Sequence, residues 1–416
     1  MPDSGPDSAS PQPSPRTVPD WERRFRAARV GLPDWAEDAP DRCVVTASAG
    51  GVVEVHSWEV GGVLRRATDR KEGTSYATLD PAGEWLWWFD DSDGDEYGVW
   101  RRQPFGTGPD RTAEDATGLD AAYPAGLVVS REGFAVVGRS DDGYGTRIHV
   151  ITQDGEPPRQ LYAHEQDAEV AALSEDSTLV AIGHSEHGDS RHPALRVVRV
   201  TDGGTVGELW DGPGRGVEPL GFSPVRGDQR LLVLHERRGR GELLVWDVAT
   251  GEHRELDLAA HGVAGEVSSA DWFRDGAFLL VAVDHEARTR LYRVDPADGA
   301  ATPVGPSAGT VHAATTRPDG EVWMLWSSAA KPATVRDLGG RIVLAAPGER
   351  APGSVSVEDV WVDGPGGRVH ALLRRPSHSG GPGPLPLVID VHGGPTAHDM
   401  DTFRPYPSAW VDHGYA

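Results

Sequence analysis

Short apolar runs separated by clusters of polar turn residues fill most of the chain, from residue 43 to about residue 350. Val, Leu, Ile and Trp dominate the runs, and such β-branched and aromatic residues favour strands. Gly, Pro, Asp and Ser dominate the intervening clusters, which is typical of turns. The apolar spacing of three and four residues that indicates a helix does not continue through this region. The pattern therefore predicts a long domain built from strands.

Six segments of this region align with one another, and each reads as a short strand, a turn and then a strongly apolar strand. The turns lie 44 to 50 residues apart, at Gly83, Gly133, Ser177, Gly227, Gly276 and Gly320. An all-strand period of this length is typical of a β-propeller with one four-stranded blade per repeat. We predict a β-propeller of about seven blades over residues 43–350. The seventh blade is expected to combine the strand pair near 50–67 with the strand at 340–348.

The residues before the propeller differ from it in composition and in apolar pattern. Residues 1–19 are acidic and rich in Pro and Ser, which predicts a disordered tail, and "WERRFRAARV" predicts a helical segment within 20–42. The tail has neither the basic start nor the apolar core of a secretory signal, and no apolar stretch approaches about 18 residues. We therefore expect no signal peptide, no membrane span and a cytoplasmic location.

Charge and cysteine content narrow the functional classes. The 416 residues carry a formal net charge of −24, which argues against a nucleic-acid partner, because phosphates require clustered Lys and Arg. Cys43 is the one cysteine, so the chain forms no internal disulfide and no cysteine-based zinc site. Cys43 is expected to be a small buried apolar residue. We expect neither a metal ion nor an organic cofactor.

Three local patterns inside the predicted propeller imitate functional motifs. Ser185 in "GHSEHG" lacks the second glycine of a Gly-x-Ser-x-Gly nucleophile turn. His184, His187 and His192 have no carboxylate or cysteine spacing of a known metal site, so a solvated loop is expected. The acidic stretch 90–98 lacks the spacing of an EF-hand, and an ordinary turn between strands is expected there.

Residues 351–416 depart from the repeat. Residues 357–376 read as a β-hairpin with a Gly-Pro-Gly-Gly turn, and 377–386 read as an exposed loop. The run "LVIDV" at 387–391 is continuously apolar, as in a strand buried on both faces of a parallel sheet. It leads directly into His392, Gly393, Gly394 and Pro395.

This order of elements predicts the first strands of an α/β-hydrolase domain. In that fold a Gly-rich loop after the third strand supplies a backbone N–H to the oxyanion hole. Glycines allow the backbone to turn that amide toward the reacting carbonyl. Gly394 and Gly393 are therefore the candidate oxyanion residues, with His392 and Pro395 supporting the motif.

The combination of propeller, hairpin, "PLVIDVHGGP" and "WVDHGYA" resembles the prolyl oligopeptidase family of serine peptidases, over residues 20–416. The His-Gly-Gly-Pro form is most similar to its acylaminoacyl-peptidase and dipeptidyl-aminopeptidase-like branch. The resemblance implies a propeller that covers a hydrolase domain and admits short peptides. It also implies that the N–H of Gly394 is one oxyanion donor and that no cofactor is needed. The paired glutamates with which dipeptidyl peptidases bind a substrate's free amine are not found here, which disfavours that subtype.

Hydrolase triads follow this motif in the chain, and no Gly-x-Ser-x-Gly occurs between Pro395 and Ala416. We therefore expect nucleophile, acid and base to lie downstream of Ala416, the chain to be a fragment or truncated, and these 416 residues to be inactive alone. Residues 351–416 would then be an incomplete domain with an exposed sheet edge.

Two alternatives remain open at this point. One is an esterase or amidase of the same fold that acts on small molecules. The other is a non-catalytic propeller that binds a protein or peptide and carries a vestigial hydrolase segment. The residues indicate no oligomeric state.

Overall fold

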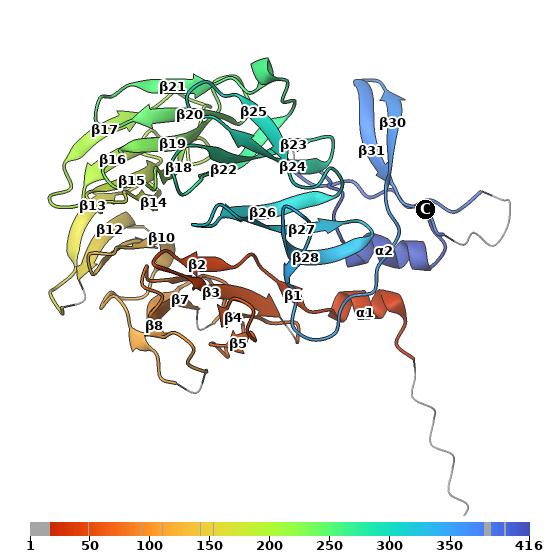
Figure 1. The fold of residues 1–416 in the computed structure, drawn as a ribbon, viewed down its shortest axis with the longest axis horizontal. Helices are drawn as coiled ribbons and strands as arrows, with labels where there is room; N and C mark the ends of the chain where they lie inside the picture. The colour runs from red at the N-terminus through yellow and green to blue at the C-terminus, as the bar shows by residue number, and fades with distance from the viewer. Residues whose placement is uncertain are drawn as a thin grey trace, which may run out of the picture.

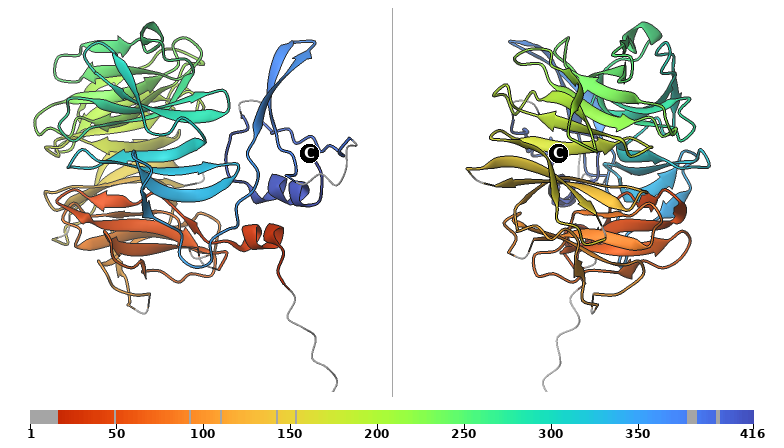
Figure 2. Two further views of the ribbon diagram at one scale, coloured as in Figure 1. Left: turned by 45° about the vertical axis from the view of Figure 1, so that its right-hand side comes forward. Right: turned by 90° about the vertical axis from the view of Figure 1, so that its left-hand side faces the viewer.

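A propeller of seven blades dominates the structure, a computed structural model that describes residues 17–416 apart from 49, 92, 110, 142, 153, 378–383, 395 and 396. Seven antiparallel sheets follow one another along the chain, and Figures 1 and 2 show them arranged side by side as blades around a common centre. The sequence prediction of a propeller with about seven blades is confirmed.

The first three blades are formed by residues 29–164. Blade 1 consists of β1 (Arg29–Val30), β2 (Asp34–Ala36), β3 (Ala39–Ser48), β4 (Val53–Glu59) and β5 (Arg65–Arg66). Blade 2 consists of β6 (Ala77–Leu79), β7 (Trp85–Asp91), β8 (Gly98–Pro104) and β9 (Glu114–Asp115). Blade 3 consists of β10 (Tyr123–Val129), β11 (Phe134–Asp141), β12 (Gly145–Thr152) and β13 (Arg159–His164).

Four further blades complete the ring. Blade 4 contains β14 (Ala168–Leu173), β15 (Leu179–His184), β16 (Ala194–Arg199) and β17 (Thr205–Leu209). Blade 5 contains β18 (Val217–Phe222), β19 (Arg230–His235), β20 (Glu242–Asp247) and β21 (His253–Leu256), followed by the 3₁₀ turn η1 (Ala259–His261). Blade 6 contains β22 (Glu266–Trp272), β23 (Leu279–His285), β24 (Arg288–Val294) and β25 (Ala301–Val304). Blade 7 contains β26 (Thr310–Thr316), β27 (Val322–Ser328), β28 (Lys331–Asp337) and β29 (Ile342–Leu344).

Three elements lie outside the blades. Helix α1 (Asp20–Arg26) precedes blade 1, and the hairpin of β30 (Glu358–Gly364) and β31 (Gly367–Leu373) follows blade 7. Helix α2 (Pro405–Asp412) lies near the end of the chain. Figure 1 shows α1, α2 and the hairpin on the same side of the propeller.

The structure changes the predicted boundaries at both ends of the propeller. The helix expected within 20–42 covers Asp20–Arg26 only, because Ala27 is already extended and β1 begins at Arg29. The seventh blade is not shared between the chain ends: β29 pairs with β28 inside blade 7, whereas β4 and β5 pair inside blade 1. Of the tail expected at 1–19, residues 1–16 lie outside the described residues.

The position of each strand in its blade explains its apolar pattern. The second strands are buried almost throughout, as in β15 and β23, because side chains from two neighbouring blades cover both of their faces. The first strands alternate, as in β14, where every second residue is exposed. Two cavities at the centre of the ring are lined by first-strand residues of all seven blades: Asp34, Thr78, Leu127, Leu173, Gly221, Asp271 and Thr315. The first strands therefore line a central channel.

The ring closes between blade 1 and blade 7 through side chains. Cys43, Val45 and Trp58 of blade 1 pack in one apolar cluster with Trp323 and Val335 of blade 7. The ring centres of Trp58 and Trp323 are 5.8 Å apart. No backbone pairing joins these two blades in the described residues, so side-chain contacts make the closure: this cluster and the hydrogen bond of 2.9 Å from Arg317 to the carbonyl oxygen of Pro40.

Trp323→Ala should therefore destabilise the whole propeller. Trp323 is only 2% exposed, and removing a buried Trp costs about 3–5 kcal/mol through lost burial and the cavity left behind. Urea unfolding of the 416-residue chain measures this cost. Trp361→Ala in the exposed hairpin is the matched control and should change the unfolding free energy by about 0.5 kcal/mol or less. Equal effects of the two substitutions would contradict a ring held by this cluster.

Candidate functional site

The segment that carries the predicted oxyanion residues is attached to one face of the propeller. Asp401 is buried, and its Oδ1 accepts a hydrogen bond of 2.8 Å from the N–H of Ala329, in the turn between β27 and β28. The N–H of Asp401 donates to the carbonyl oxygen of Ala287, in the turn between β23 and β24, at 2.8 Å. Both turns join the second strand of a blade to its third. The C-terminal segment therefore lies on the face of the propeller where these turns emerge.

Helix α1 holds the same segment from the other end of the chain. The guanidinium of Arg24 is almost fully buried and forms an ion pair of 2.5 Å with Asp412 in α2. It also donates to the carbonyl oxygens of Pro352 and Gly353, at 3.2 and 2.6 Å for the shortest contacts. Since the remaining donors are used on backbone oxygens, the buried cation is well compensated. This contact ties the start of the chain to α2.

His392, Gly393 and Gly394 lie exposed in this segment, and Pro395 lies outside the described residues. The Nδ1 of His392 lies 2.7 Å from the carbonyl oxygen of Gly393. Gly394 has a φ of 143°, in the left-handed half of the Ramachandran map that residues with a Cβ rarely adopt. Glycine is therefore favoured at position 394 because of the backbone conformation there.

The buried strand predicted at 387–391 is not formed. Leu387, Ile389 and Val391 are 61, 77 and 76% exposed, respectively. The N–H of Val388 donates to the oxygen of Ala416, and the N–H of Ala416 donates to the oxygen of Pro386, both at 2.9 Å. This pair of bonds is the repeat unit of a parallel ladder, with Ala416 opposite Leu387. An apolar run becomes a strand only where partners extend the ladder, and here the pairing covers a single residue.

The residues of the propeller that resemble functional motifs are buried or make contacts with neighbouring side chains. Ser185 is buried at the end of β15, and His187 stacks on Trp210 with ring centres 3.9 Å apart. His192 pairs with Asp189 at 2.8 Å. Within the described residues, no group of three or more His, Cys, Asp or Glu side chains is placed to hold a metal ion. Cys43 is buried, and this burial raises the pKa of its thiol to about 12.

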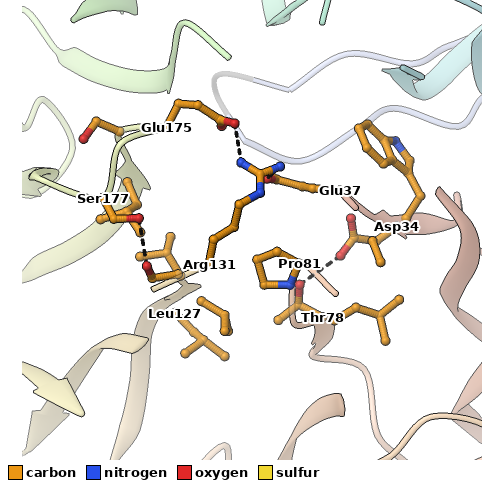
Figure 3. Close-up of a pocket in the computed structure, with 16 residues that line it drawn as sticks. Asp34, Glu37, Thr78, Pro81, Leu127, Arg131, Glu175 and Ser177 are labelled. Atoms are coloured by element: carbon orange, nitrogen blue, oxygen red, sulfur yellow. Dashed lines mark hydrogen bonds and ion pairs between the residues drawn. The ribbon is translucent and has the colours of Figure 1, made fainter. Parts of the chain in front are cut away.

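The central channel contains two cavities. Its two cavities, of about 280 and 270 Å³, share Asp34, Trp35, Glu37, Leu173 and Glu175, so they are parts of one lumen. Figure 3 shows Asp34 and Arg131 reaching into this space from opposite sides. The Oγ1 of Thr78 donates to the carboxylate of Asp34 at 3.0 Å.

Two lumen carboxyls are less acidic than usual. Desolvation by the surrounding blades raises the pKa of Asp34 to about 6, against a partial opposing effect of the Thr78 hydrogen bond. Desolvation raises the pKa of Asp271 to about 6 as well, although the backbone N–H of Trp272 favours the charged form. Both side chains keep contact with water in the channel. Sequence reasoning missed these residues, because only ring closure places them in one enclosed space.

The described part of the chain has no helix long and apolar enough to cross a membrane.

Comparison of the sequence with known family profiles found no match, and comparison with curated proteins found none either. Solved structures do match. The chain superimposes on a prolyl endopeptidase with a TM-score of 0.71 at 17% identity, over 95% of this chain and 60% of the other. It matches a puromycin hydrolase with a TM-score of 0.72 at 16% identity, over 96% of this chain and 67% of the other. A puromycin-hydrolysing peptidase of Mycobacterium tuberculosis gives 0.73 at 20% identity, with the same two coverages.

At sequence identities of 16–20%, the similarity to these three structures establishes the fold alone. The chain has the propeller fold found in peptidases of the prolyl oligopeptidase type, and the resemblance inferred from sequence is confirmed at that level. The chain spans between 60 and 67% of the length of these three solved chains.

Asp34→Asn should stabilise the protein near neutral pH. The pKa of Asp34 is raised from 3.8, so the folded state binds the proton more tightly than the unfolded state does. Stability therefore falls as the pH rises from about 4 to about 6, and the amide removes this penalty. We expect a gain of about 1 kcal/mol at pH 7, below the ~3 kcal/mol of a fully buried group because channel water screens the charge.

Urea unfolding at pH 7 and pH 4 measures this difference, which should vanish at pH 4. Asp363→Asn, in the exposed hairpin, is the control and should show no such pH dependence. A loss of stability in Asp34→Asn that is equal at both pH values would contradict a raised pKa.

Proposed function

We propose that the chain is the propeller-bearing part of a cytoplasmic serine peptidase that hydrolyses short peptides, with the propeller controlling access. The observation that carries the proposal is the match in fold to three peptidase or hydrolase structures over 95–96% of this chain. The position of the two glycines, directly after an apolar run and on the face where the C-terminal segment docks, supports it further.

The proposed reaction proceeds through an acyl-enzyme. A serine hydroxyl attacks the peptide carbonyl while a base takes its proton, and the amine leaves with that proton. Water then attacks the acyl-enzyme, which releases the carboxylic acid product and restores the serine hydroxyl. We place the three catalytic residues, the nucleophile, the base and the acid, C-terminal to Ala416, and we assign none of these roles to residues of this chain.

The contribution of this chain to the chemistry is the Gly393–Gly394 backbone. A backbone N–H aimed at the developing oxyanion stabilises the transition state by about 3–4 kcal/mol. The left-handed φ of Gly394 supports the proposal, because it is the kind of conformation that an oxyanion loop needs and that a side chain would oppose. The parallel hydrogen bonds between 386–388 and Ala416 also support it, since parallel strands flank this loop in α/β-hydrolases.

The test uses the protein purified from its native source, with its intact mass compared with 44.5 kDa. We expect a larger mass, hydrolysis of short peptide p-nitroanilides and covalent labelling by a fluorophosphonate. Ester and puromycin substrates in the same assay distinguish a peptidase from an esterase or an amidase. A protein of 44.5 kDa with neither hydrolysis nor labelling would favour the non-catalytic propeller instead.

Gly394→Ala in that native protein should lower kcat by 100- to 1,000-fold, because a Cβ displaces the left-handed backbone and with it the oxyanion donor. Gly366→Ala is the matched control: Gly366 lies in the β30–β31 turn, its φ is not positive and an added Cβ meets open space. This variant should keep full activity. Retention of full kcat by Gly394→Ala would remove the loop from the oxyanion hole.

A further inference from the structure

The two cavities of the central channel have the size and lining of a small-molecule site, and the proposed chemistry at Gly394 does not use them. Their volumes of about 280 and 270 Å³ are close to the ~300 Å³ at which protein pockets begin to hold drug-sized ligands. Leu127 and Leu173 supply apolar wall, and Trp35 lines both cavities. An apolar wall with a few polar groups is typical of sites that bind small molecules.

Six charged side chains of the described residues line these cavities, and four of them neutralise one another. Arg131 pairs with Glu37 at 2.5 Å and with Glu175, and Figure 3 shows its guanidinium lying between the two carboxylates. Arg274 pairs with Glu175 at 3.2 Å and with Glu37 at 3.7 Å. Arg131 also contacts Asp38 at 3.0 Å. Both arginines are therefore fully engaged with these carboxylates.

The other two charged side chains are Asp34 and Asp271, which line one cavity together and form no ion pair with any described residue. The hydroxyl of Thr78 donates to Asp34 at 3.0 Å. The N–H of Trp272 donates to the Oδ1 of Asp271 at 2.8 Å, and Thr316 donates to the same carboxylate. These donors are all neutral. The cavity therefore holds two negative charges that no cation of the described chain compensates.

An organic ammonium ion is the cation that suits this lining. Calcium takes six to eight oxygen ligands, and two carboxylates from different blades supply too few of them. A primary ammonium group needs only acceptors for its three N–H donors, and an indole such as that of Trp35 attracts cations. Leu127 and Leu173 can pack against the attached carbon chain. We propose that the central channel binds small molecules that carry a primary ammonium group, with Asp34 and Asp271 as their anionic partners.

Calorimetric titration of the native protein with butylamine at pH 7 tests the proposal without any catalytic assay. We expect a single site with a dissociation constant of about 1 mM or below. 1-Butanol, which has nearly the same shape without the charge, should not bind. This comparison needs no variant, so it holds whatever a substitution does to folding.

Asp34→Asn and Asp271→Asn should each raise the dissociation constant about 10-fold, because each removes one charge-assisted contact. The double variant should show no binding. Asp363→Asn, in the exposed hairpin, is the matched control and should bind butylamine as the native protein does.

Binding should also weaken on acidification. Desolvation, with Glu37 as a nearby anion, raises the pKa of Asp34 to about 6. Desolvation raises the pKa of Asp271 to about 6 as well, against the opposing attraction of Arg274. Butylamine stays protonated throughout, whereas each carboxyl is mostly neutral at pH 5. The dissociation constant should therefore rise about 10-fold or more between pH 7 and pH 5.

A free alkylamine and the amino terminus of a peptide share the ammonium group, and glycinamide distinguishes these two sources. Glycinamide carries the ammonium and the adjoining amide of a peptide terminus. Binding at least 10-fold tighter than that of butylamine assigns the site to peptide termini, an assignment that rests on the proposed function. Equal binding assigns the site to amines in general.

Two results would overturn the proposal. One is the absence of butylamine binding up to about 50 mM at pH 7, well above the expected constant. The other is an unchanged dissociation constant in the Asp34→Asn and Asp271→Asn double variant while this variant still unfolds cooperatively in urea. Peptide hydrolysis is measured separately, so hydrolysis together with either result would leave the proposed function standing and remove only the ammonium site.

Discussion

Every blade of this protein has two apolar faces, and no blade can bury either face by itself. The second strands show the consequence, because β15, β19 and β23 are buried by side chains of the blades on both sides. The ring must therefore close, and it closes without a shared strand. Trp58 and Trp323 supply the apolar contact, and the Nε1 of Trp35 donates to Thr315 at 3.2 Å across the same boundary. The central channel and the residues that line it depend on these side-chain contacts.

Most of the fold could be predicted from sequence because each blade is local in the chain. Neighbouring strands within a blade are joined by short turns, so the repeat of apolar runs and turn glycines reports the blades directly. Two errors came from features that are not local. A helical segment was expected within residues 20–42, yet the helix ends at Arg26 and blade 1 begins at Arg29. The strand at 340–348 was expected to combine with the strand pair near 50–67 in a seventh blade, but β29 pairs with β28 instead.

The candidate site was predictable only in part, for a similar reason. The glycines after "LVIDV" could be selected as candidates because their proposed role depends on local backbone, and Gly394 does adopt a positive φ. The buried strand predicted before them is not formed, because a parallel strand needs hydrogen-bonding partners along its length and here the pairing covers a single residue. Arg131, Glu175 and Arg274 left a weaker trace, because they occupy one position of the aligned repeats. Their ion pairs form only once the ring brings turns of different blades together.

The antiparallel order of the strands assigns different roles to the two ends of the channel. Turns between first and second strands can emerge only on one face, and turns between second and third strands only on the other. Asp401 binds the second kind of turn, so the segment carrying Gly393 and Gly394 is held on that face. The turns that carry Glu37, Arg131, Glu175 and Arg274 are of the first kind and therefore lie on the opposite face.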